Sequence, residues 1–237
     1  INMADLKVVY FPSCINRAMG KNEFQKEEDL QLTALTHQLL ERAGYTIIYP
    51  KELDAHCCGM PFSSKGFTEV NHKQSQLLEA DLLRVSDNGK YPILYDMSPC
   101  FYHSKEEFTS NLKIVDPIAF MLDFVLPKLT VKKKKEAVAI FPVCSVKKIG
   151  KMDQLLALAH YCAEQVTMID SNCCGFAGDR GFLIPELNEH GLRDIKNQIP
   201  SNCTSGYSTS RTCEIGLEKA SGISFTSIFY LIEEVTR

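Results

Sequence analysis

The sequence has no long run of apolar residues. None of its hydrophobic stretches approaches the roughly 20 residues that a helix needs to span a bilayer, so no transmembrane segment is expected. The first residues also lack the charged-then-apolar pattern of a secretory signal. The chain begins Ile1-Asn2-Met3, which is compatible with an excised piece of a longer polypeptide. These features predict a cytoplasmic protein, with a peripheral position at the inner face of the membrane as the alternative.

An excess of positive charge is also missing. The net charge is −3 and the only basic run is Lys132 to Lys135, so nucleic-acid binding is not expected. No Ser/His/Asp arrangement, phosphate-binding glycine loop or paired carboxylate site stands out. Trp is absent, which excludes nothing. A hydrophobic content of 45% over 237 residues is ordinary for one globular α/β domain or two smaller ones.

Cysteine, in contrast, is abundant. The chain has ten cysteines and no secretory signal. In a reducing compartment, such cysteines are more often metal ligands or catalytic thiols than disulfides. The cysteines are therefore the first place to look for a site.

The cysteine motifs occur twice in the same order. An apolar run (7–11, then 137–141) is followed by proline and a cysteine, then by a helical pattern and a short β-branched run (46–49, then 166–169). Cys-Cys-Gly comes next, and a further cysteine follows. This duplication predicts a first repeat at residues 1–131, a linker at 132–135 and a second repeat at 136–237.

Strand and helix patterns alternate within each repeat. Apolar residues recur at helical spacing over 32–43, where Gly44 ends the pattern, and over 152–163. The short apolar runs 92–95 and 113–115 read as buried strands. The alternation predicts an α/β fold made of two pseudo-symmetric halves, each a small parallel sheet flanked by helices.

Four cysteines in each repeat form a candidate site. We expect each to follow a strand, where loops at the carboxyl ends of parallel strands converge. We call Cys14, Cys57, Cys58 and Cys100 the first set, and Cys144, Cys173, Cys174 and Cys213 the second set. Each set is predicted to meet at one point in its own half.

The Cys-Cys-Gly sequence bears on the kind of site. A mononuclear zinc site usually uses Cys-x-x-Cys, whereas neighbouring cysteines point apart and grip a larger cluster more naturally. Gly59 and Gly175 allow a positive φ, so that backbone amides can approach sulfur. Metal ligation is the preferred reading. A redox-active thiol pair, buried core thiols and a structural disulfide framework are the alternatives.

The repeated pattern Cys…Cys-Cys-Gly…Cys resembles the CCG cysteine-rich domain family, as in the B subunit of heterodisulfide reductase and the iron–sulfur subunit of glycolate oxidase. The stretches 11–14, 173–182 and 210–216 are similar to the carboxyl-terminal region of FAD-linked D-lactate and 2-hydroxyacid dehydrogenases. The resemblance implies an oxidoreductase module in which an iron–sulfur cluster, 4Fe-4S by preference, passes on electrons from a flavin domain. It implies two partners, a flavin-containing dehydrogenase domain or subunit and a ferredoxin-like iron–sulfur segment. Neither is part of this sequence, so the chain is not expected to be catalytically complete alone.

The sequence departs from the family's fullest pattern at two positions. That pattern ends each set with Cys-x-x-Cys, but here His103 follows Cys100 and Gly216 follows Cys213. His103 is therefore included as a candidate metal ligand. Because of this departure, three possibilities stay open: a cubane cluster, zinc in one or both sites, or a site without metal. Two further functions stay open with it, a zinc-stabilised structural or subunit-binding module and a thiol–disulfide catalyst.

Other residues near the motifs are assigned lesser roles. Cys162 is expected in the core of its helix, and Cys203 as a structural or free thiol. An exposed loop position is the favoured interpretation of His56, with a hydrogen bond to sulfur as the alternative. Arg180 in the glycine-rich loop is interpreted either as part of a surface ion pair or as a cation facing the site, and Arg17 is a weaker candidate for the second role. Asp96 and Asp170 end predicted strands and are assigned no chemistry.

Overall fold

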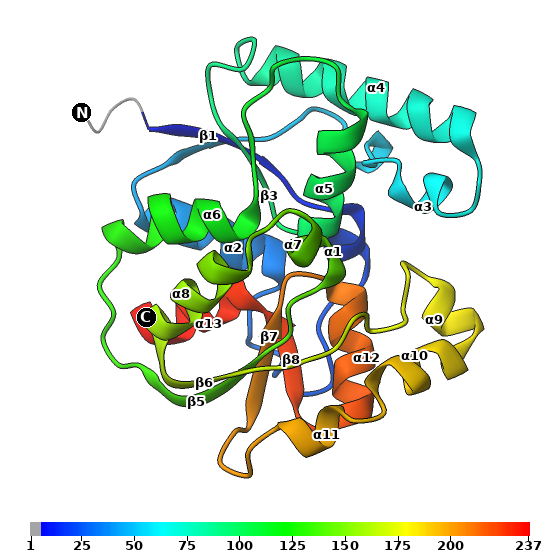
Figure 1. Cartoon of the computed structure of the whole chain (residues 1–237). Helices are drawn as coiled ribbons and strands as arrows, with labels where there is room; N and C mark the ends of the chain where they lie inside the picture. Colours follow the sequence, from blue (N-terminus) through cyan, green and yellow to red (C-terminus); the bar gives the residue numbers. More distant parts are fainter. Residues whose placement is uncertain (1–5) are drawn as a thin grey trace. The chain divides into compact units, whose positions relative to one another are not determined.

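The computed structural model describes residues 6–237, which include every cysteine. The expectations about the first five residues, the missing signal and the start of the first repeat, lie outside the described residues. Contacts divide the chain into two units. The first unit contains the residues up to Gly20 and Leu30–Leu129, and the second contains Lys21–Asp29 and Thr130–Arg237. Each unit has a sheet of four parallel strands with helices around it, so the predicted fold class of two similar α/β halves is confirmed (Figure 1).

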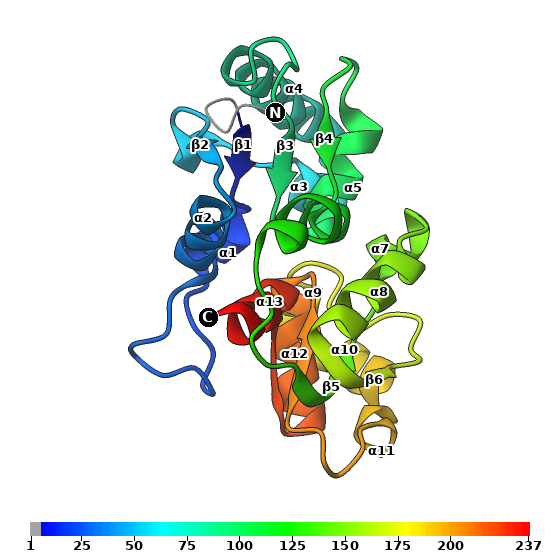
Figure 2. The ribbon, with the colours of Figure 1, turned by 90° about the vertical axis from the view of Figure 1, so that its left-hand side faces the viewer.

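The sheet of the first unit has the strand order β2-β1-β3-β4, which Figure 2 shows side by side. Its strands are β1 (Lys7–Phe11), β2 (Thr46–Ile48), β3 (Ile93–Tyr95) and β4 (Ile114–Val115). Its α-helices are α1 (Cys14–Ala18), α2 (Leu32–Arg42), α3 (Met60–Ser63), α4 (Thr68–Val85), α5 (Ser98–Glu107) and α6 (Pro117–Phe120). Three other short helices are η2 (Leu53–Ala55), η3 (Met121–Val125) and η4 (Leu126–Lys128).

The second unit repeats this order as β6-β5-β7-β8. Its strands are β5 (Lys135–Ile140), β6 (Ala163–Met168), β7 (Ser205–Ser208) and β8 (Ser224–Ser227). Its helices are α7 (Cys144–Lys148), α8 (Met152–Cys162), α9 (Arg180–Leu183), α10 (Pro185–Leu192), α11 (Ile195–Gln198), α12 (Arg211–Ser221) and α13 (Ile228–Thr236). The equivalent strands of the two units are therefore β1 and β5, β2 and β6, β3 and β7, and β4 and β8.

The central strand of each sheet explains why these sheets form. The run Val8–Phe11 in β1 and the run Val138–Ile140 in β5 are almost completely buried, at 0–1% exposure. A continuous apolar run is typical of a parallel strand that is covered on both faces. In each sheet the next strand in sequence lies on one side of the central strand, and the strand after that lies on its other side. The crevice outside the carboxyl ends of β1 and β3, or of β5 and β7, is the position where open α/β sheets bind ligands.

The predicted helices and strands agree with the structure where the sequence pattern is strongest. The pattern over 32–43 is α2, and Gly44 follows it with a φ of +83°, as a residue that ends a helix should. The pattern over 152–163 is α8, which ends at Cys162. One expectation needs correction: the cysteines were expected in loops, but one cysteine after each of β1, β3, β5 and β7 lies in the first turn of a helix.

The segment Lys21–Asp29, which joins α1 to α2, belongs by its contacts to the second unit. Asn22 Nδ2 donates hydrogen bonds to Glu218 Oε1 of α12 and to the carbonyl oxygen of Phe225 of β8, the latter at 3.4 Å. The second unit is therefore made from two separate stretches of sequence.

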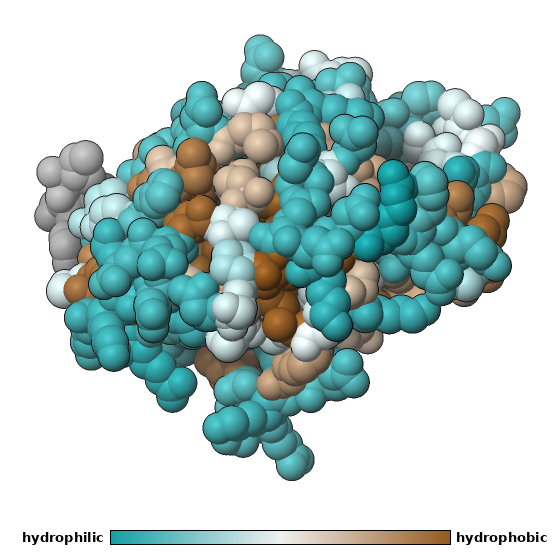
Figure 3. Space-filling view, turned by 60° about the horizontal axis from the view of Figure 1, so that its bottom comes forward, coloured by the Kyte–Doolittle hydropathy of each residue, from teal (hydrophilic) through white to brown (hydrophobic). Residues whose placement is uncertain are grey.

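Within residues 6–237, no helix is both long enough and apolar enough to cross a bilayer. Hydrophilic residues cover most of the face drawn in Figure 3, and the hydrophobic areas between them are small.

Candidate metal centre

The topology of the first unit brings the first set to the switch point of its sheet. Cys14 begins α1 directly after β1, and Cys100 lies in the first turn of α5 after β3. The two strands are neighbours, with Phe11 opposite Tyr95. Cys57 and Cys58 reach the same place in the loop that leads from η2 into α3. A helix amino terminus carries a partial positive charge, which favours a thiolate at Cys14 and Cys100.

The four sulfurs of the first set form a continuous chain of contacts. Each thiol lies close enough to the next to change its pKa: Cys57 acts on Cys14, Cys58 on Cys57, and Cys100 on Cys58. The hydrogen bond with Cys57 and burial raise the pKa of Cys14. The hydrogen bond with Cys100 and burial raise the pKa of Cys58. Four thiols this close can lie together because most of them hold their protons, and a bound cation would replace those protons.

The second set has the same arrangement in the second unit. Cys144 begins α7 after β5, Cys213 lies in the first turn of α12 after β7, and the Cys-Cys pair lies in the loop between β6 and α9. Cys174 Sγ lies 2.9 Å from Cys213 Sγ. Cys173 lies between Cys144 and Cys174, and hydrogen bonds with their thiols lower its pKa.

Backbone amides point at sulfur in both loops. Gly59 N donates to Cys57 Sγ at 3.4 Å, and Gly175 N donates to Cys173 Sγ at 3.4 Å. Both glycines have a positive φ, +93° and +75°. A Cβ atom at Gly59 would lie 2.3 Å from Asn71 Oδ1, and one at Gly175 would lie 2.1 Å from the carbonyl oxygen of Leu187. Only glycine fits these two positions, as the Cys-Cys-Gly motif predicted.

The donor set of each unit fits a soft metal centre. It consists of four thiols, a loop amide directed at sulfur and the amino termini of two helices, and thiolates select iron–sulfur clusters, zinc or copper(I). The sulfurs follow one another as a chain. Among the described residues, no three His, Cys, Asp or Glu side chains surround a point as ligands of a single metal ion. The match to a cluster therefore rests on the chemistry of the four thiol donors. It does not rest on a preformed arrangement of ligands around one ion.

The histidines and Arg17 lie beside the first set with partners of their own. His103 Nε2 lies 2.7 Å from Asn71 Oδ1, and burial lowers the pKa of His103. His56 Nε2 lies 2.9 Å from Asp81 Oδ2. Arg17 is bound to Asp54 at 2.6 Å and donates to the carbonyl oxygen of His56. The ligand role of His103 stays a prediction, since its ring nitrogen contacts an amide oxygen.

The two remaining cysteines lie in the core and apart from the sets. Cys162 is completely buried in α8, as predicted. Cys203 is also buried, and its thiol donates to the carbonyl oxygen of Ser205 at 3.4 Å. Of its two predicted roles, structural or exposed, the structure therefore supports the structural one.

Three residues that support the sets were not assigned by the sequence. Ser75 Oγ donates to the carbonyl oxygen of Cys58 at 2.9 Å, and Asn188 Nδ2 donates to that of Cys174 at 2.6 Å. Both come from helices after the Cys-Cys loops, and no spacing rule marks them. Asp96 accepts hydrogen bonds from Tyr10 Oη and from the amide of Ser13, both at 2.9 Å. Its position at the end of a buried strand, close before Cys100, was a signal that could have identified it.

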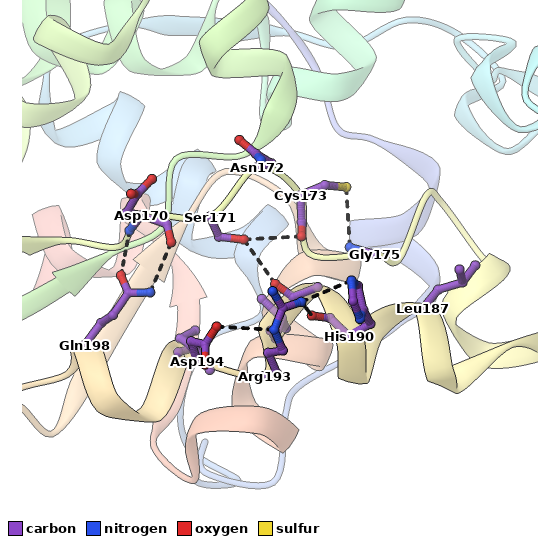
Figure 4. Close-up of a pocket in the computed structure, with 13 residues that line it drawn as sticks. Asp170, Ser171, Asn172, Cys173, Gly175, Leu187, His190, Arg193, Asp194 and Gln198 are labelled. Carbon is purple, nitrogen blue, oxygen red and sulfur yellow. Dashed lines mark hydrogen bonds and ion pairs between the residues drawn. The ribbon is translucent and has the colours of Figure 1, made fainter.

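A cavity of about 570 Å³ lies beside the second set. Figure 4 shows Cys173 and Gly175 on one side of it and Arg193 with His190 on the other. Arg193 Nη1 donates to the carbonyl oxygen of His190 at 2.9 Å, and Arg193 Nε lies 3.4 Å from Asp194 Oδ2. Cys173 is thus the member of the second set that lines this cavity.

Comparison with known proteins agrees with this class of site. The family described as "CCG: Cysteine-rich domain" matches residues 8–104, so the resemblance drawn from the motifs is confirmed for that part of the chain. The C subunit of anaerobic glycerol-3-phosphate dehydrogenase from Escherichia coli K12 is 27% identical over 139 residues, as is the protein of the same name from E. coli O157:H7. The match covers 53% of this chain but only 35% of those relatives.

Two solved structures show a weaker likeness. Aspartate racemase from Picrophilus torridus aligns over 97% of this chain and 93% of its own, with 10% identity and a TM-score of 0.41. Glutamate racemase from Aquifex pyrophilus aligns over 94% of this chain and 79% of its own, with 13% identity and a TM-score of 0.40. Likenesses at this level carry no argument about function.

Proposed function

We propose that this chain is an iron–sulfur electron-transfer module of a dehydrogenase, with one centre held by each set of cysteines. The observation that carries the proposal is the repetition: four thiols lie at the switch point of each sheet, and each set includes a glycine amide directed at sulfur. A bound cluster of this kind accepts and releases single electrons. Cys14, Cys57, Cys58 and Cys100 would hold the first, and Cys144, Cys173, Cys174 and Cys213 the second.

The name of the relatives supports the dehydrogenase context. The matched protein of E. coli is by its name one subunit of a larger enzyme, anaerobic glycerol-3-phosphate dehydrogenase. By analogy, a flavin-containing domain or subunit would oxidise the substrate and pass electrons to this module. The motif resemblance favours D-lactate or another 2-hydroxy acid as that substrate, and a 4Fe-4S cluster as the type of centre. Glycerol 3-phosphate, like a 2-hydroxy acid, is a small anion that carries the hydroxyl group to be oxidised.

Serine substitutions in the Cys-Cys pairs test the proposal. Iron and acid-labile sulfide would be measured after anaerobic purification of the full chain, of Cys57→Ser/Cys58→Ser and of Cys173→Ser/Cys174→Ser. Because each set is supplied within one unit, each double variant should lose about half of the iron and keep its helix content by circular dichroism. The control variants are Cys162→Ala and Cys203→Ala, which alter buried cysteines outside the sets. Both should keep all of the iron.

The alternatives give other results in the same experiment. Colourless protein with stoichiometric zinc would replace the proposal with a structural zinc module. Metal-free protein with reactive neighbouring thiols would replace it with a thiol–disulfide catalyst. Loss of all metal from either double variant would show that the two sets share one centre.

A further inference from the structure

Asp96 distinguishes the first unit from the second. This carboxylate is 1% exposed and lies at the end of β3, and it accepts from the amide of Ser13, the residue before Cys14. The hydrogen bond ties the turn after β1, which carries Cys14, to the turn after β3, which carries Cys100. In the second unit, Thr209 and Val143 occupy the positions of Asp96 and Ser13. Thr209 is also buried, but it is uncharged and its hydroxyl has no hydrogen-bond partner within the described part of the chain.

The partners of Asp96 leave its charge uncompensated. Tyr10 Oη and the Ser13 amide are neutral donors, one to each carboxylate oxygen, an arrangement that suits the ionised group. Burial raises the pKa of Asp96 overall, and the hydrogen bonds from Ser13 and Tyr10 limit this rise. In residues 6–237, no Lys, Arg or His lies within ion-pair distance of Asp96. A second buried carboxylate, Asp116, lies at the end of the neighbouring strand β4, where the second unit has Ser227.

Charge around the second set has the opposite sign. Lys147 and Lys148 follow Cys144 in α7, and Lys147 Nζ donates to the carbonyl oxygen of Ser171, two residues before Cys173. The one buried carboxylate beside Cys213 in the described chain is Glu214, which lies 3.8 Å from Arg211 Nη1. In the first unit, the cation next to Cys14 is Arg17, whose charge is matched by Asp54. The first set therefore lies in a more negative surrounding than the second.

Reduction adds a negative charge to a cluster, so a buried anion nearby opposes it and a cation favours it. We infer that Asp96 positions the Cys14 and Cys100 turns and lowers the reduction potential of the first centre below that of the second. This inference rests on the proposed function. The two centres then differ as electron donors, because the centre of lower potential, in the first unit, gives up an electron more readily than the centre in the second.

Variants with a single centre make the two potentials measurable separately. The full chain with Cys173→Ser/Cys174→Ser would retain only the first centre, and the full chain with Cys57→Ser/Cys58→Ser only the second. Both would be titrated anaerobically with mediators and followed by visible absorption and electron paramagnetic resonance. At one applied potential, the ratio of reduced to oxidised centre should be at least about tenfold lower for the first centre, which corresponds to about 59 mV for one electron.

Asp96→Asn, made in the variant that keeps the first centre, tests the role of the charge. The asparagine side chain retains an oxygen for the Ser13 amide, so the fold should change little. Because the negative charge is lost, the reduced-to-oxidised ratio should rise by about tenfold. Asp96→Glu keeps the charge and should keep the parent ratio. Thr209→Val, made in the variant that keeps the second centre, is the matched control: it alters the equivalent buried position without changing charge, and its ratio should not move.

The outcomes separate the inference from the proposed function. If neither single-set variant holds iron, the proposed function fails and the inference fails with it. If iron is present but Asp96→Asn leaves the potential unchanged, or Asp96→Glu shifts it equally, only the inference is overturned. If Asp96→Asn loses iron with an unchanged circular dichroism spectrum, recovery of iron in Asp96→Glu supports the positioning role, and no recovery overturns it.

Discussion

Gly59 and Gly175 let each Cys-Cys loop pack directly against the helix that follows it. At Gly175 the nearest obstacle to a side chain is backbone, the carbonyl oxygen of Leu187, which has little freedom to move. At Gly59 it is the side chain of Asn71, whose Oδ1 also contacts the His103 ring. The motif thus determines the local backbone as well as two of the candidate ligands.

We predict that Gly175→Ala destabilises the second unit far more than Gly178→Ala. The two glycines have φ values of +75° and +79°, but a Cβ at Gly178 meets no atom of the described residues within 4 Å. Gly178→Ala should lower the free energy of unfolding only by the backbone strain, about 1–2 kcal/mol. Gly175→Ala adds the clash and should cost about 3 kcal/mol or more. Denaturant unfolding of both variants measures the difference, and equal losses would contradict the packing described for the Cys-Cys loop.

The sequence predicted that each Cys-Cys pair needs a glycine after it, because the motif repeats, and the structure agrees. The ligand role of the eight cysteines stays a prediction. The sequence did not predict Ser75 or Asn188, whose hydrogen bonds to Cys58 and Cys174 depend on how α4 and α10 fold back onto the loops. Such contacts arise from tertiary packing and leave no periodic trace in a single sequence.

The elements show the same division between strong and weak patterns. The strands β1, β3 and β5 carry apolar runs and were predicted. The strands β7 (sequence SGYS) and β8 (SFTS) are rich in serine and carry little hydrophobic signal. They form because β5 and the neighbouring strands supply hydrogen-bonding partners, with Tyr207 opposite Ile140 and Phe225 opposite Gly206. Tertiary contacts, and not the local sequence, therefore determine that these two segments form strands.

Helix α12 carries a carboxylate whose ionisation should affect stability. Glu218 accepts from Asn22 Nδ2 and from the amide of Phe225, and burial raises its pKa from 4.5 to about 7. The folded chain therefore keeps a proton on Glu218 in a range of pH where the unfolded chain has lost it. The resulting stabilisation is fully present below pH 4.5 and is lost as the pH rises to about 7.

We predict that Glu218→Gln removes this dependence on pH. Glutamine keeps an oxygen for both donors and has no proton to lose. The variant should be more stable than the wild type by about 1 kcal/mol at about pH 8, with solvent screening included, and the difference should vanish towards pH 4.5. Thermal unfolding across this range measures it. Glu28→Gln, an exposed position of the same contacting segment, should show no such trend.

At the scale of the whole molecule, the cores and the cysteine sets are separate. The largest buried side chains, such as Tyr10, Phe120, Tyr207 and Phe229, come from strands and helices and not from the Cys-Cys loops. The proposed metal binding would therefore contribute to the order of the loops without being needed for the sheets.

We predict that chelation of the metal leaves the fold intact. After anaerobic treatment with a strong iron chelator, far-ultraviolet circular dichroism should be nearly unchanged, because the buried strands keep their contacts. The loops around residues 57–59 and 173–175 should become sensitive to proteolysis and to oxidation of their thiols. A cooperative loss of helix on chelation would contradict this and would make the metal part of the folding core.

The segment Lys21–Asp29 has a consequence for synthesis on the ribosome. It is translated before its partners Glu218, Phe225 and Tyr230, which lie far later in the sequence. At roughly 5–20 residues per second, the segment emerges on the order of 10–40 s before those residues exist. The first sheet can assemble during that interval, whereas the second unit can be completed only when α13 has left the exit tunnel. Folding of the nascent chain is therefore ordered, and the early segment stays without its partners until α12, β8 and α13 have been translated.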